Sequence, residues 1–285
     1  MARIVIAGCG DVGTALGLQL IQAGHTVWGL RRNPSRLPAE LQPLAADLTE
    51  PATLRSLPPR LDYMVYAAAA GGSSPERYRA AYVDGVANIL QALQTQGQRL
   101  RRLILTSSTS VYGQMDGAYL DEDAPAQASG FGPESLRVGE ELVWNSEHPA
   151  LVIRFGGIYG PGRSRLIDSV RNGRALCTPG LYTNRIHRDD CAGAIAHLLQ
   201  LENPARLYLG VDDEPALQCD VMGWLARQLG VAEPQQKAVA GSAAERQMRA
   251  NKRCSNARLR ASAYRFHYPS YREGYRALLN SADAD

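Results

Sequence analysis

The stretch Arg3-Ile-Val-Ile-Ala-Gly-Cys-Gly-Asp-Val-Gly13 decides the fold of this chain. Its first part, Ile4 to Ala7, is a short apolar run rich in β-branched side chains, which predicts a buried strand. Glycines follow with the spacing Gly8-x-Gly10-x-x-Gly13, and a helical pattern begins directly after them. A strand, a glycine-rich turn and a helix in this order predict a βαβ unit that binds a dinucleotide.

Each glycine of this turn has a mechanical role in that interpretation. Gly8 permits the tight turn, Gly10 lets a pyrophosphate approach the backbone, and Gly13 lets the helix pack closely on the strand. The start of the helix, with Asp11 and Val12, offers free N–H groups and the positive end of the helix dipole to the pyrophosphate. The alternative is a βαβ turn that is only structural.

The residues after the second strand indicate which dinucleotide is bound. The second strand is expected at residues 25–30, and NAD sites usually place an acidic residue after it, whereas NADP sites place arginine there. This chain has Arg31 and Arg32 and no acid in that window. Since arginine binds phosphate in a bidentate manner, NADP is favoured over NAD as the cofactor. In the alternative interpretation both arginines are only loop charges.

Further strands are expected at residues 44–48, 62–70, 103–107, 151–155 and 206–210, with helices between them. Strands that alternate with helices predict an α/β fold, a Rossmann-type doubly wound parallel sheet with a smaller C-terminal substrate-binding region. The expected domains are an NAD(P)-binding domain at 1–155 and a substrate-side region at 156–285. Segments near 185–210 are expected to return to the Rossmann sheet.

The ends of these strands supply the remaining cofactor residues, because ligands bind at the carboxyl ends of the strands in such sheets. Asp47 and Leu48 are expected at the adenine, and the small side chains of Ala67 and Ala68 at the middle of the dinucleotide. Ser107, at the end of the fifth strand, completes the predicted cofactor site.

Composition excludes several other functions. The chain has 285 residues, a net charge of +3, 45% hydrophobic and 21% charged residues, which is ordinary for a globular protein and gives no reason to expect nucleic acid or a membrane as partner. Five scattered cysteines without C-x-x-C spacing argue against a disulfide framework or structural zinc and fit a reducing compartment, so no metal is expected. No signal peptide and no membrane-length apolar run is visible, and we expect a cytoplasmic protein.

The chain resembles the extended short-chain dehydrogenase/reductase superfamily, specifically its NAD(P)-dependent nucleotide-sugar epimerase/dehydratase group, in an atypical form. The resemblance covers nearly the whole length. It is carried by the glycine loop, Asp47-Leu48, Ser107-Ser-Thr-Ser-Val-Tyr-Gly113, Arg154 with Tyr159-Gly-Pro-Gly162, His187-Arg-Asp-Asp190 and Gly210-Val-Asp-Asp-Glu-Pro215.

The resemblance also implies a catalytic set that this chain lacks in part. Family members use a Ser or Thr, a Tyr-x-x-x-Lys pair and often a helical Asn, and Ser108 matches the Ser/Thr position. The tyrosine and lysine positions fall on Gly132 and Leu136, or on Phe131 and Ser135 when the alignment slides by one residue, and the Asn position falls on Tyr82. No lysine occurs between residues 1 and 236, so no realignment within this domain recovers the pair.

Two functions of different classes follow. In the first, the chain is an NADP-dependent oxidoreductase with a displaced acid or base. The candidate replacements are Tyr112, Tyr159, His187 and Tyr182, each near a predicted strand end or cleft loop, and Ser108 is expected to contact the substrate. Each of these residues has an alternative, purely structural role, as a hydroxyl at a strand end, a structural tyrosine or a packed histidine. In the second, the chain binds NAD(P) without turnover, as a redox sensor or partner-binding module. A vestigial structural protein is a third possibility.

Substrate and assembly are indicated only by the resemblance. The positions of Asn184 and Arg185, and the arginines in the second half of the chain, imply a small anionic substrate, with surface arginine as the alternative for each. The arginines and their neighbour are Arg163, Arg165, Arg253, Arg258 and Asn256. Family members often form homodimers through two helices, expected here at about 75–97 and 133–147.

Overall fold

The structure, a computed structural model, describes residues 1–237 and 251–282. Its main feature is a seven-stranded sheet with the order β12-β7-β5-β4-β1-β2-β3. The pairings from β3 through β5 are all parallel. In chain order the strands of this sheet are β1 (Arg3–Ala7), β2 (Thr26–Arg31), β3 (Gln42–Ala45), β4 (Tyr63–Tyr66), β5 (Arg102–Ser108), β7 (Ala150–Phe155) and β12 (Leu207–Gly210).

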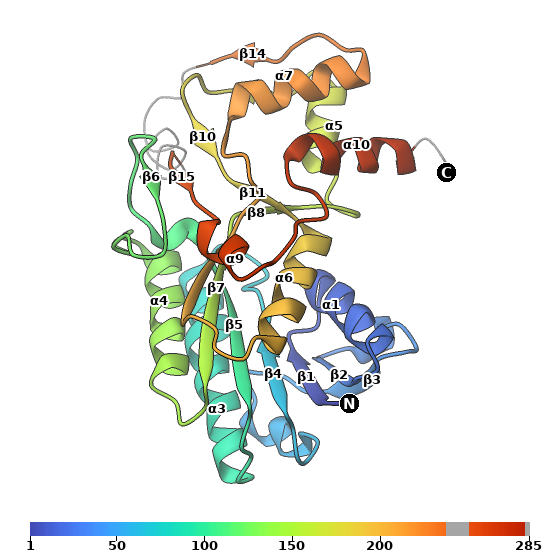
Figure 1. Cartoon of the computed structure of the whole chain (residues 1–285), viewed down its shortest axis with the longest axis vertical. Coiled ribbons are helices and arrows are strands. Elements are labelled where there is room, and N and C mark those ends of the chain that lie inside the picture. Colours follow the sequence, from blue (N-terminus) through green and yellow to red (C-terminus); the bar gives the residue numbers. More distant parts are fainter. Residues whose placement is uncertain (238–250, 283–285) are drawn as a thin grey trace. The chain divides into compact units, whose positions relative to one another are not determined.

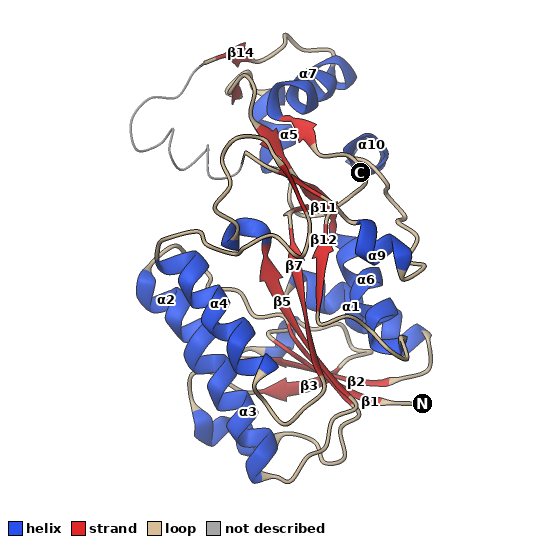
Figure 2. Cartoon of the chain, turned by 60° about the vertical axis from the view of Figure 1, so that its left-hand side comes forward, coloured by secondary structure: helices blue, strands red, loops and turns tan. Residues whose placement is uncertain are grey.

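Helices connect these strands and cover both faces of the sheet. Figure 2 shows α3 and α4 on one side of the strands and α1 on the other, and Figure 1 gives the same arrangement in chain colours. The α-helices are α1 (Asp11–Gln22), α2 (Pro75–Arg79), α3 (Gly85–Thr95), α4 (Phe131–Trp144), α5 (Arg165–Arg171), α6 (Arg188–Gln200), α7 (Gln218–Leu229), α9 (Ala257–Ala261) and α10 (Tyr271–Ala282). Shorter helical segments are η1 (Pro34–Arg36), η2 (Pro51–Ser56), η3 (Ala80–Asp84), which is π-helical, and η4 (Thr109–Val111).

This arrangement confirms the predicted Rossmann-type α/β fold. The chain first builds the sheet outward through β1, β2 and β3, then returns to the other side of β1 with β4. The strand order therefore reverses between β1 and β4. In open α/β sheets this reversal leaves a crevice at the carboxyl ends of the two strands, where ligands bind.

The hydrophobic pattern explains why these elements pack as they do. Ile4, Val5 and Ile6 in β1 are all buried, as expected for a strand covered by helices on both faces. In α3, Val86 and Ile89 are buried three residues apart and share one face, which packs into the same core cluster as Val5. Burial of this cluster holds the sheet and its helices together.

The chain forms two compact units, each described separately below. Unit 1 contains residues 1–111, 129–154 and 191–208, and unit 2 contains residues 112–128, 155–190 and 209–285. The assignment of cofactor binding and substrate binding to two domains stays a prediction. Unit 2 is built around short strand pairs, which are β8 (Gly157–Tyr159) with β11 (Arg185–His187), β6 (Tyr119–Leu120) with β15 (Arg253–Cys254), β10 (Tyr182–Thr183) with β13 (Ala216–Leu217), and β9 (Leu176–Cys177) with β14 (Gln235–Gln236).

Some expected boundaries differ in the structure. The strand predicted at 44–48 is β3 at Gln42–Ala45, because the Asp47 carboxylate accepts hydrogen bonds from the backbone N–H and hydroxyl of Thr49 and turns the chain. β4 ends at Tyr66, well before residue 70. Helix α4 begins before the expected Glu134, whose carboxylate accepts the Gly130 backbone N–H at 3.0 Å and caps the helix start.

A disulfide joins Cys177 and Cys219, contrary to the expectation from the scattered cysteines, which argued against disulfides. Their spacing of 42 residues carries no motif, but the start of α7 lies beside β9 and brings the two Cα atoms to 5.1 Å. That distance is within the range for a disulfide. Only the tertiary arrangement of unit 2 creates this pairing. Cys9, Cys191 and Cys254 are free and buried.

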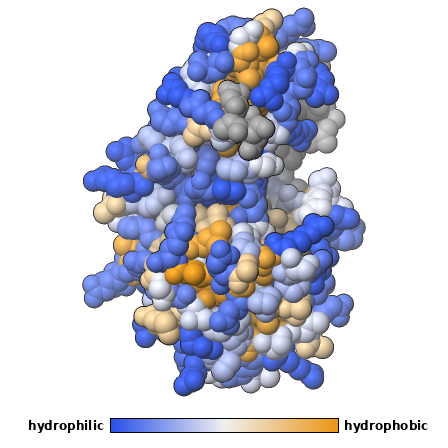
Figure 3. All heavy atoms as spheres, turned by 90° about the vertical axis from the view of Figure 1, so that its right-hand side faces the viewer, coloured by the Kyte–Doolittle hydropathy of each residue, from blue (hydrophilic) through white to orange (hydrophobic). Residues whose placement is uncertain are grey.

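The surface is of mixed polarity. On the face shown in Figure 3, hydrophobic side chains gather in the lower half of the view and hydrophilic side chains surround them. Apolar atoms make up much of the surface of any folded protein, so this area alone indicates no partner. Within the described ranges, no helix has the length and apolar character needed to span a bilayer.

Candidate cofactor and active site

The glycine turn closes tightly against the neighbouring strands of unit 1. The backbone N–H groups of Gly8 and Cys9 both donate to the Leu30 carbonyl, at 3.0 and 2.9 Å. Gly8 has φ +78°, and a Cβ atom there would lie 2.4 Å from the Cα atom of Ala68. Position 8 therefore requires glycine both for its backbone angle and for the close approach of the chain after β4.

Gly10 and Gly13 differ in their surroundings, and the difference fits their predicted roles. A Cβ atom on Gly13 would lie 2.9 Å from a methyl group of Ile6, so Gly13 permits the contact between α1 and β1. A Cβ atom on Gly10 would meet nothing closer than 3.8 Å, which leaves its outer side open. Gly10 is the N-cap of α1 and no side chain caps the helix, which starts with Asp11 and Val12. The first N–H groups of α1 are thus available to an anion.

The two arginines predicted to select NADP lie at the end of β2. Arg31 pairs with Ala45 of β3, and Arg32 is exposed directly after the strand. Burial raises the pKa of the Cys9 thiol, while the Thr14 hydroxyl and the Arg31 guanidinium act in the opposite direction. Arg31 therefore lies close enough to the glycine turn to act on it electrostatically.

Asp47 and Leu48 follow β3 at the same edge of the sheet. Burial raises the pKa of Asp47, but hydrogen bonds from Thr49 and the nearby Arg32 outweigh it, so the pKa is lowered and the group stays ionised. The Leu48 carbonyl accepts a hydrogen bond from the Asn88 side chain at 2.9 Å. The residues predicted to contact the adenine thus lie in a loop that side-chain hydrogen bonds stabilise.

The end of β4, which carries Ala67 and Ala68, lies beside the glycine turn. The Ala67 N–H donates to the Ala7 carbonyl at 2.8 Å, which continues the pairing of β4 with β1 by one residue. Ala68 then makes the close approach to Gly8. Small residues are required here, and they leave the edge of the sheet unobstructed at the point where the strand order reverses.

Ser107 takes part in a buried network that the sequence did not reveal. Its hydroxyl donates to Glu140 of α4 at 2.6 Å, and the same carboxylate accepts two hydrogen bonds from Arg154 of β7. Its proton is therefore committed to Glu140. Its neighbour Ser108, in contrast, accepts the Ser110 N–H at 3.1 Å and keeps its own proton to donate.

The positions to which the resemblance assigns the Tyr-x-x-x-Lys pair lie beside an aromatic cluster in unit 1. Phe131 and Gly132 form the first turn of α4, and Leu136 is buried in the same helix. The ring of Tyr78 lies 5.4 Å from that of Phe131 and 5.5 Å from that of Tyr82. The ring of Tyr78 thus packs against both other rings beside these positions.

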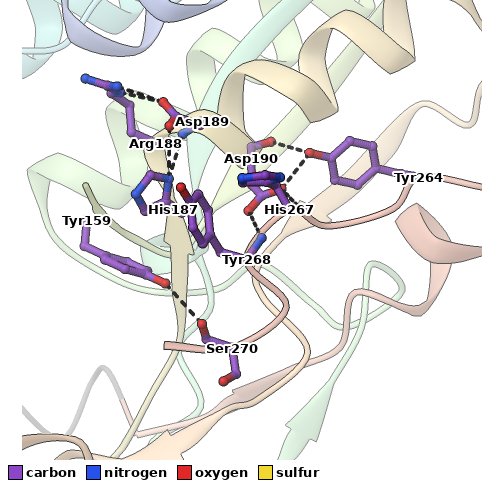
Figure 4. Close-up of polar contacts among 9 residues, drawn as sticks. All are labelled: Tyr159, His187, Arg188, Asp189, Asp190, Tyr264, His267, Tyr268 and Ser270. Atoms are coloured by element: carbon purple, nitrogen blue, oxygen red, sulfur yellow. Dashed lines mark hydrogen bonds and ion pairs between the residues drawn. The ribbon is translucent and has the colours of Figure 1, made fainter. Parts of the chain in front are cut away.

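Tyr159 and His187 lie in unit 2, on the paired strands β8 and β11 (Figure 4). The Tyr159 hydroxyl donates to the Ser270 carbonyl at 3.3 Å, and burial raises the Tyr159 pKa. Burial lowers the His187 pKa, and its imidazole packs against the rings of Tyr159 and Tyr268. At neutral pH neither group is a ready proton acceptor for a substrate, since the phenol stays protonated and the imidazole is shut off from solvent.

The nitrogen atoms of His187 differ in their contacts. Nδ1 accepts the backbone N–H of Asp189 at 3.2 Å, which places the proton of the neutral ring on Nε2. Nε2 has no hydrogen-bond partner among the described residues. Asp190, three residues after His187, is fully buried and accepts hydrogen bonds from Tyr264, His267 and Tyr268 (Figure 4). Asp190 therefore fixes the segment 264–268, which is a structural role.

Tyr112 is also fully buried, and its carbonyl accepts a hydrogen bond from the Lys252 amine at 2.5 Å. Lys252 is one of only two lysines in the chain and is 2% exposed. Burial lowers its pKa to about 8. Lys252 was not among the predicted site residues, because it lies far outside any Tyr-x-x-x-Lys spacing. The one available signal was the choice of lysine in a chain that otherwise uses arginine.

The candidate substrate residues of unit 2 separate into two groups. The side chains of Asn184 and Asn256 bond to backbone atoms of the chain, and Arg258 pairs with Asp123 at 2.8 Å. Arg185 is buried in β11, while Arg163 and Arg165 are exposed at the start of α5. Asn184, Asn256 and Arg258 are therefore engaged within unit 2.

Arg253 is held differently from these residues. Its guanidinium lies over the rings of Tyr119 and Tyr182, at 3.9 and 4.6 Å from their centroids, and its Nε donates to the Gly117 carbonyl at 2.7 Å. Tyr182 is therefore a stacking partner in this structure. Within residues 1–237 and 251–282, no carboxylate forms an ion pair with Arg253.

Comparison with known proteins identifies the family. The profile of the NAD dependent epimerase/dehydratase family matches residues 4–208. The chain belongs to this family. It is also similar to a putative NAD-dependent epimerase/dehydratase from Methylobacillus flagellatus, a solved structure with 38% identity, 99% of each chain covered and a TM-score of 0.83.

Two further similarities bear on ligand and activity. A Streptomyces 3-diazoavenalumate denitrifying reductase is 29% identical over 255 residues, which cover 81% of this chain and 83% of that protein. The human epimerase family protein SDR39U1, solved with NADPH, is 20% identical, with 94% and 96% of the two chains covered and a TM-score of 0.75. At that identity the human protein shows the fold alone.

Proposed function

We propose that this chain is an oxidoreductase that binds NADP in unit 1 and moves a hydride to or from a small anionic carbonyl or hydroxyl compound, nucleotide-sugars included. NAD is the alternative cofactor. The reaction proceeds without the Tyr-x-x-x-Lys pair that the wider family uses.

One observation carries the cofactor assignment: an uncapped helix start beside an open glycine. The N–H groups of α1 have no side-chain cap at Gly10, and a Cβ atom there would meet nothing closer than 3.8 Å. These features fit a pyrophosphate, which needs N–H donors and close backbone approach. Arg31 and Arg32, at the end of the adjacent strand, supply charge for a 2′-phosphate.

Two observations support turnover: the hydroxyl of Ser108 and the similarity to a reductase. When bound, the dinucleotide supplies or accepts the hydride, and the protein has to orient the substrate and its proton. The Ser108 hydroxyl keeps its proton available at the end of β5. The Streptomyces relative carries the name of a reductase, which favours an enzyme over a binding-only module.

Arg253 supports an anionic substrate. Its guanidinium is oriented by two rings and the Gly117 carbonyl, so little side-chain entropy remains to be lost when it binds a phosphate or carboxylate. We expect Arg253→Ala to weaken binding of UDP or benzoate, used as phosphate and carboxylate probes in calorimetry, about tenfold or more. Arg258→Ala is the matched control and should change the affinity little, because Asp123 already neutralises that side chain. Equal effects of both variants would contradict the assignment.

The activity is tested by mixing purified protein with NADPH and a panel of nucleotide-sugars, aromatic and aliphatic carbonyl compounds and quinones. Protein-dependent loss of absorbance of the reduced nicotinamide supports the oxidoreductase. Tight NADPH binding without turnover across the panel favours the second candidate, a binding-only sensor or partner module. Failure to bind NADPH or NADH would refute both.

The predicted homodimer through the two helices near 75–97 and 133–147 remains part of this proposal. A groove of about 560 Å³ lies between α3 and α4, lined in part by Ala87, Leu90, Val138 and Leu142. Val138 is 40% exposed on α4. Light scattering that returns a mass twice 30.9 kDa would support the dimer. A cytoplasmic location likewise stays a prediction.

A further inference from the structure

The disulfide of unit 2 joins one buried cysteine to one that is partly exposed. Cys177 ends strand β9, is 2% exposed and packs in a core cluster with Val221 and Leu225 of α7. Cys219 lies in the first turn of α7, is only partly buried and packs against that cluster. Thiol–disulfide exchange requires access to one sulfur, and exposed disulfides are more labile than enclosed ones. Cys219 therefore offers a thiol from solution a point of attack.

Hydrogen bonds beside the disulfide connect the same two segments. Gln218 precedes Cys219, and its side-chain carbonyl accepts the Thr178 N–H at 2.8 Å. The backbone N–H of Gln218 donates to the Leu181 carbonyl, also at 2.8 Å. Strand β10, which starts at Tyr182, then pairs with β13. The disulfide thus ends, with a covalent bond, a series of contacts that fixes the chain as far as Tyr182.

This segment leads to a ring that orients Arg253. Tyr182 lies five residues after Cys177, and its backbone N–H donates to the Asn251 side chain at 2.8 Å. The ring of Tyr182 lies 4.6 Å from the Arg253 guanidinium, and the ring of Tyr119 lies 3.9 Å from it. The orientation of Arg253 therefore depends on where the backbone of Tyr182 is held. Loosening of the chain after Cys177 would reach the guanidinium through this ring.

We propose that Cys177–Cys219 is a redox-sensitive site that exchanges with a low-molecular-weight thiol or dithiol and thereby controls anion binding at Arg253. The oxidised pair keeps Tyr182 stacked on the guanidinium, whereas the reduced pair frees the segment that carries this ring. In the reduced protein Arg253 loses more side-chain entropy when it binds an anion, so its affinity is lower. This inference rests on the proposed role of Arg253 and adds regulation to it.

The exchange proceeds in two balanced steps. In the first, an external thiolate attacks Sγ of Cys219, the S–S bond to Cys177 breaks, and the Cys177 sulfur leaves as a thiolate that takes a proton. In the second, another external thiolate attacks the external sulfur of the mixed disulfide and releases the Cys219 thiolate, which also takes a proton. The products are two protein thiols and one external disulfide, and an external disulfide reverses both steps.

The test compares the full-length protein after equilibration with oxidised and with reduced glutathione, followed by desalting without oxygen. Alkylation in denaturant and mass spectrometry should count three modified cysteines in the oxidised protein and five in the reduced protein. Calorimetry should then give a dissociation constant for UDP that is about three- to tenfold higher in the reduced protein, the effect expected when one side chain becomes free to rotate. Reoxidation should restore the original value, and circular dichroism should show the same fold in both states.

Two variants serve as controls. Cys177→Ala/Cys219→Ala removes the disulfide and should bind UDP as weakly as the reduced wild type, with no response to glutathione. Cys191→Ala removes a buried free cysteine of unit 1 and should keep the full response. The comparison of the two wild-type states needs neither variant, so it decides the proposal even if the double variant does not fold.

Other outcomes overturn the proposal. UDP affinity that is unchanged by reduction shows that the disulfide only supports the fold. Unfolding on reduction, or the same cysteine count in both glutathione states, excludes a reversible switch in the folded protein. In these three cases weaker UDP binding by Arg253→Ala still supports the proposed function. If the oxidised wild type binds UDP no better than oxidised Arg253→Ala, the anion site fails and its regulation fails with it, while NADPH binding tests the cofactor site separately.

Discussion

The guanidinium of Arg154 and the carboxylate of Glu140 form a two-point ion pair inside unit 1. Arg154 Nε lies 2.9 Å from Oε1 and Nη2 lies 2.6 Å from Oε2, while the side chains are 5% and 1% exposed. The hydroxyl of Ser107 also donates to this carboxylate. The pair therefore ties β5, β7 and α4 together.

Breaking this pair should destabilise the fold strongly. We expect Arg154→Met to lower the free energy of unfolding by about 3–5 kcal/mol, because it leaves the Glu140 carboxylate buried without its counterion. The double variant Glu140→Met/Arg154→Met should cost less than the sum of the two single variants, since neither charge then remains unpaired. Urea unfolding measures these values. Arg99→Met is the control, because the Arg99–Glu147 pair is largely exposed and should contribute under about 1 kcal/mol. Additive losses in the double variant would contradict the prediction.

Substitution of Gly8 and Gly10 should separate folding from cofactor binding. Gly8→Ala places a methyl group against the Ala68 backbone at a positive φ, and we expect a loss of more than about 2 kcal/mol in unfolding free energy. Gly10→Ala meets open space, so its unfolding free energy should change by under about 0.5 kcal/mol while NADPH affinity falls. Thermal melts and calorimetry distinguish the two effects. A Gly10→Ala protein with unchanged affinity would place the pyrophosphate elsewhere.

The two arginines after β2 should discriminate between the cofactors. Removing both with Arg31→Ala/Arg32→Ala should weaken NADP binding by ~1–3 kcal/mol, the loss expected for charge-assisted hydrogen bonds to the 2′-phosphate. NAD lacks this phosphate, so its affinity should change little. Arg36→Ala, an exposed arginine a few residues further on, serves as the control. Equal weakening of NADP and NAD would refute the assignment.

The buried Lys252 should make stability depend on pH. Burial lowers its pKa from 10.5 to about 8, so between about pH 8 and 10.5 the unfolded chain binds a proton that the folded chain has lost. The free energy of unfolding therefore rises with pH across that window, by about 1.4 kcal/mol per unit of pKa difference. Below pH 8 the amine is charged in the folded chain, and the full cost of burying that charge lowers stability.

Lys252→Met removes this contribution and provides the measurement. The unfolding free energy of the wild type, relative to that of Lys252→Met, should increase between pH 7.5 and pH 10. Subtracting the variant cancels the other groups that titrate in this range. Lys237→Met removes an exposed lysine, and its curve of unfolding free energy against pH should run parallel to that of the wild type. Parallel curves for Lys252→Met as well would show that the amine is not buried in solution.

Features of the site that depend on residues close in sequence could be predicted from the sequence. The turn at Gly8, Gly10 and Gly13 is one of these, because it depends on local backbone geometry and a fixed spacing. Lys252 and the Cys177–Cys219 disulfide could not be predicted, since each joins parts of the chain that lie far apart in sequence. The same holds for the ring cluster around Tyr82, which needs three elements to meet.

By itself the sequence determined the Rossmann-type sheet and the glycine turn. These depend on hydrophobic periodicity, on glycine at strained or crowded positions, and on which residue types are present at all. The tertiary structure alone decided which distant residues meet. The contact of Lys252 with the Tyr112 carbonyl and the packing of Tyr78 on Tyr82 and Phe131 depend on how separate elements pack, and no local pattern encodes that packing.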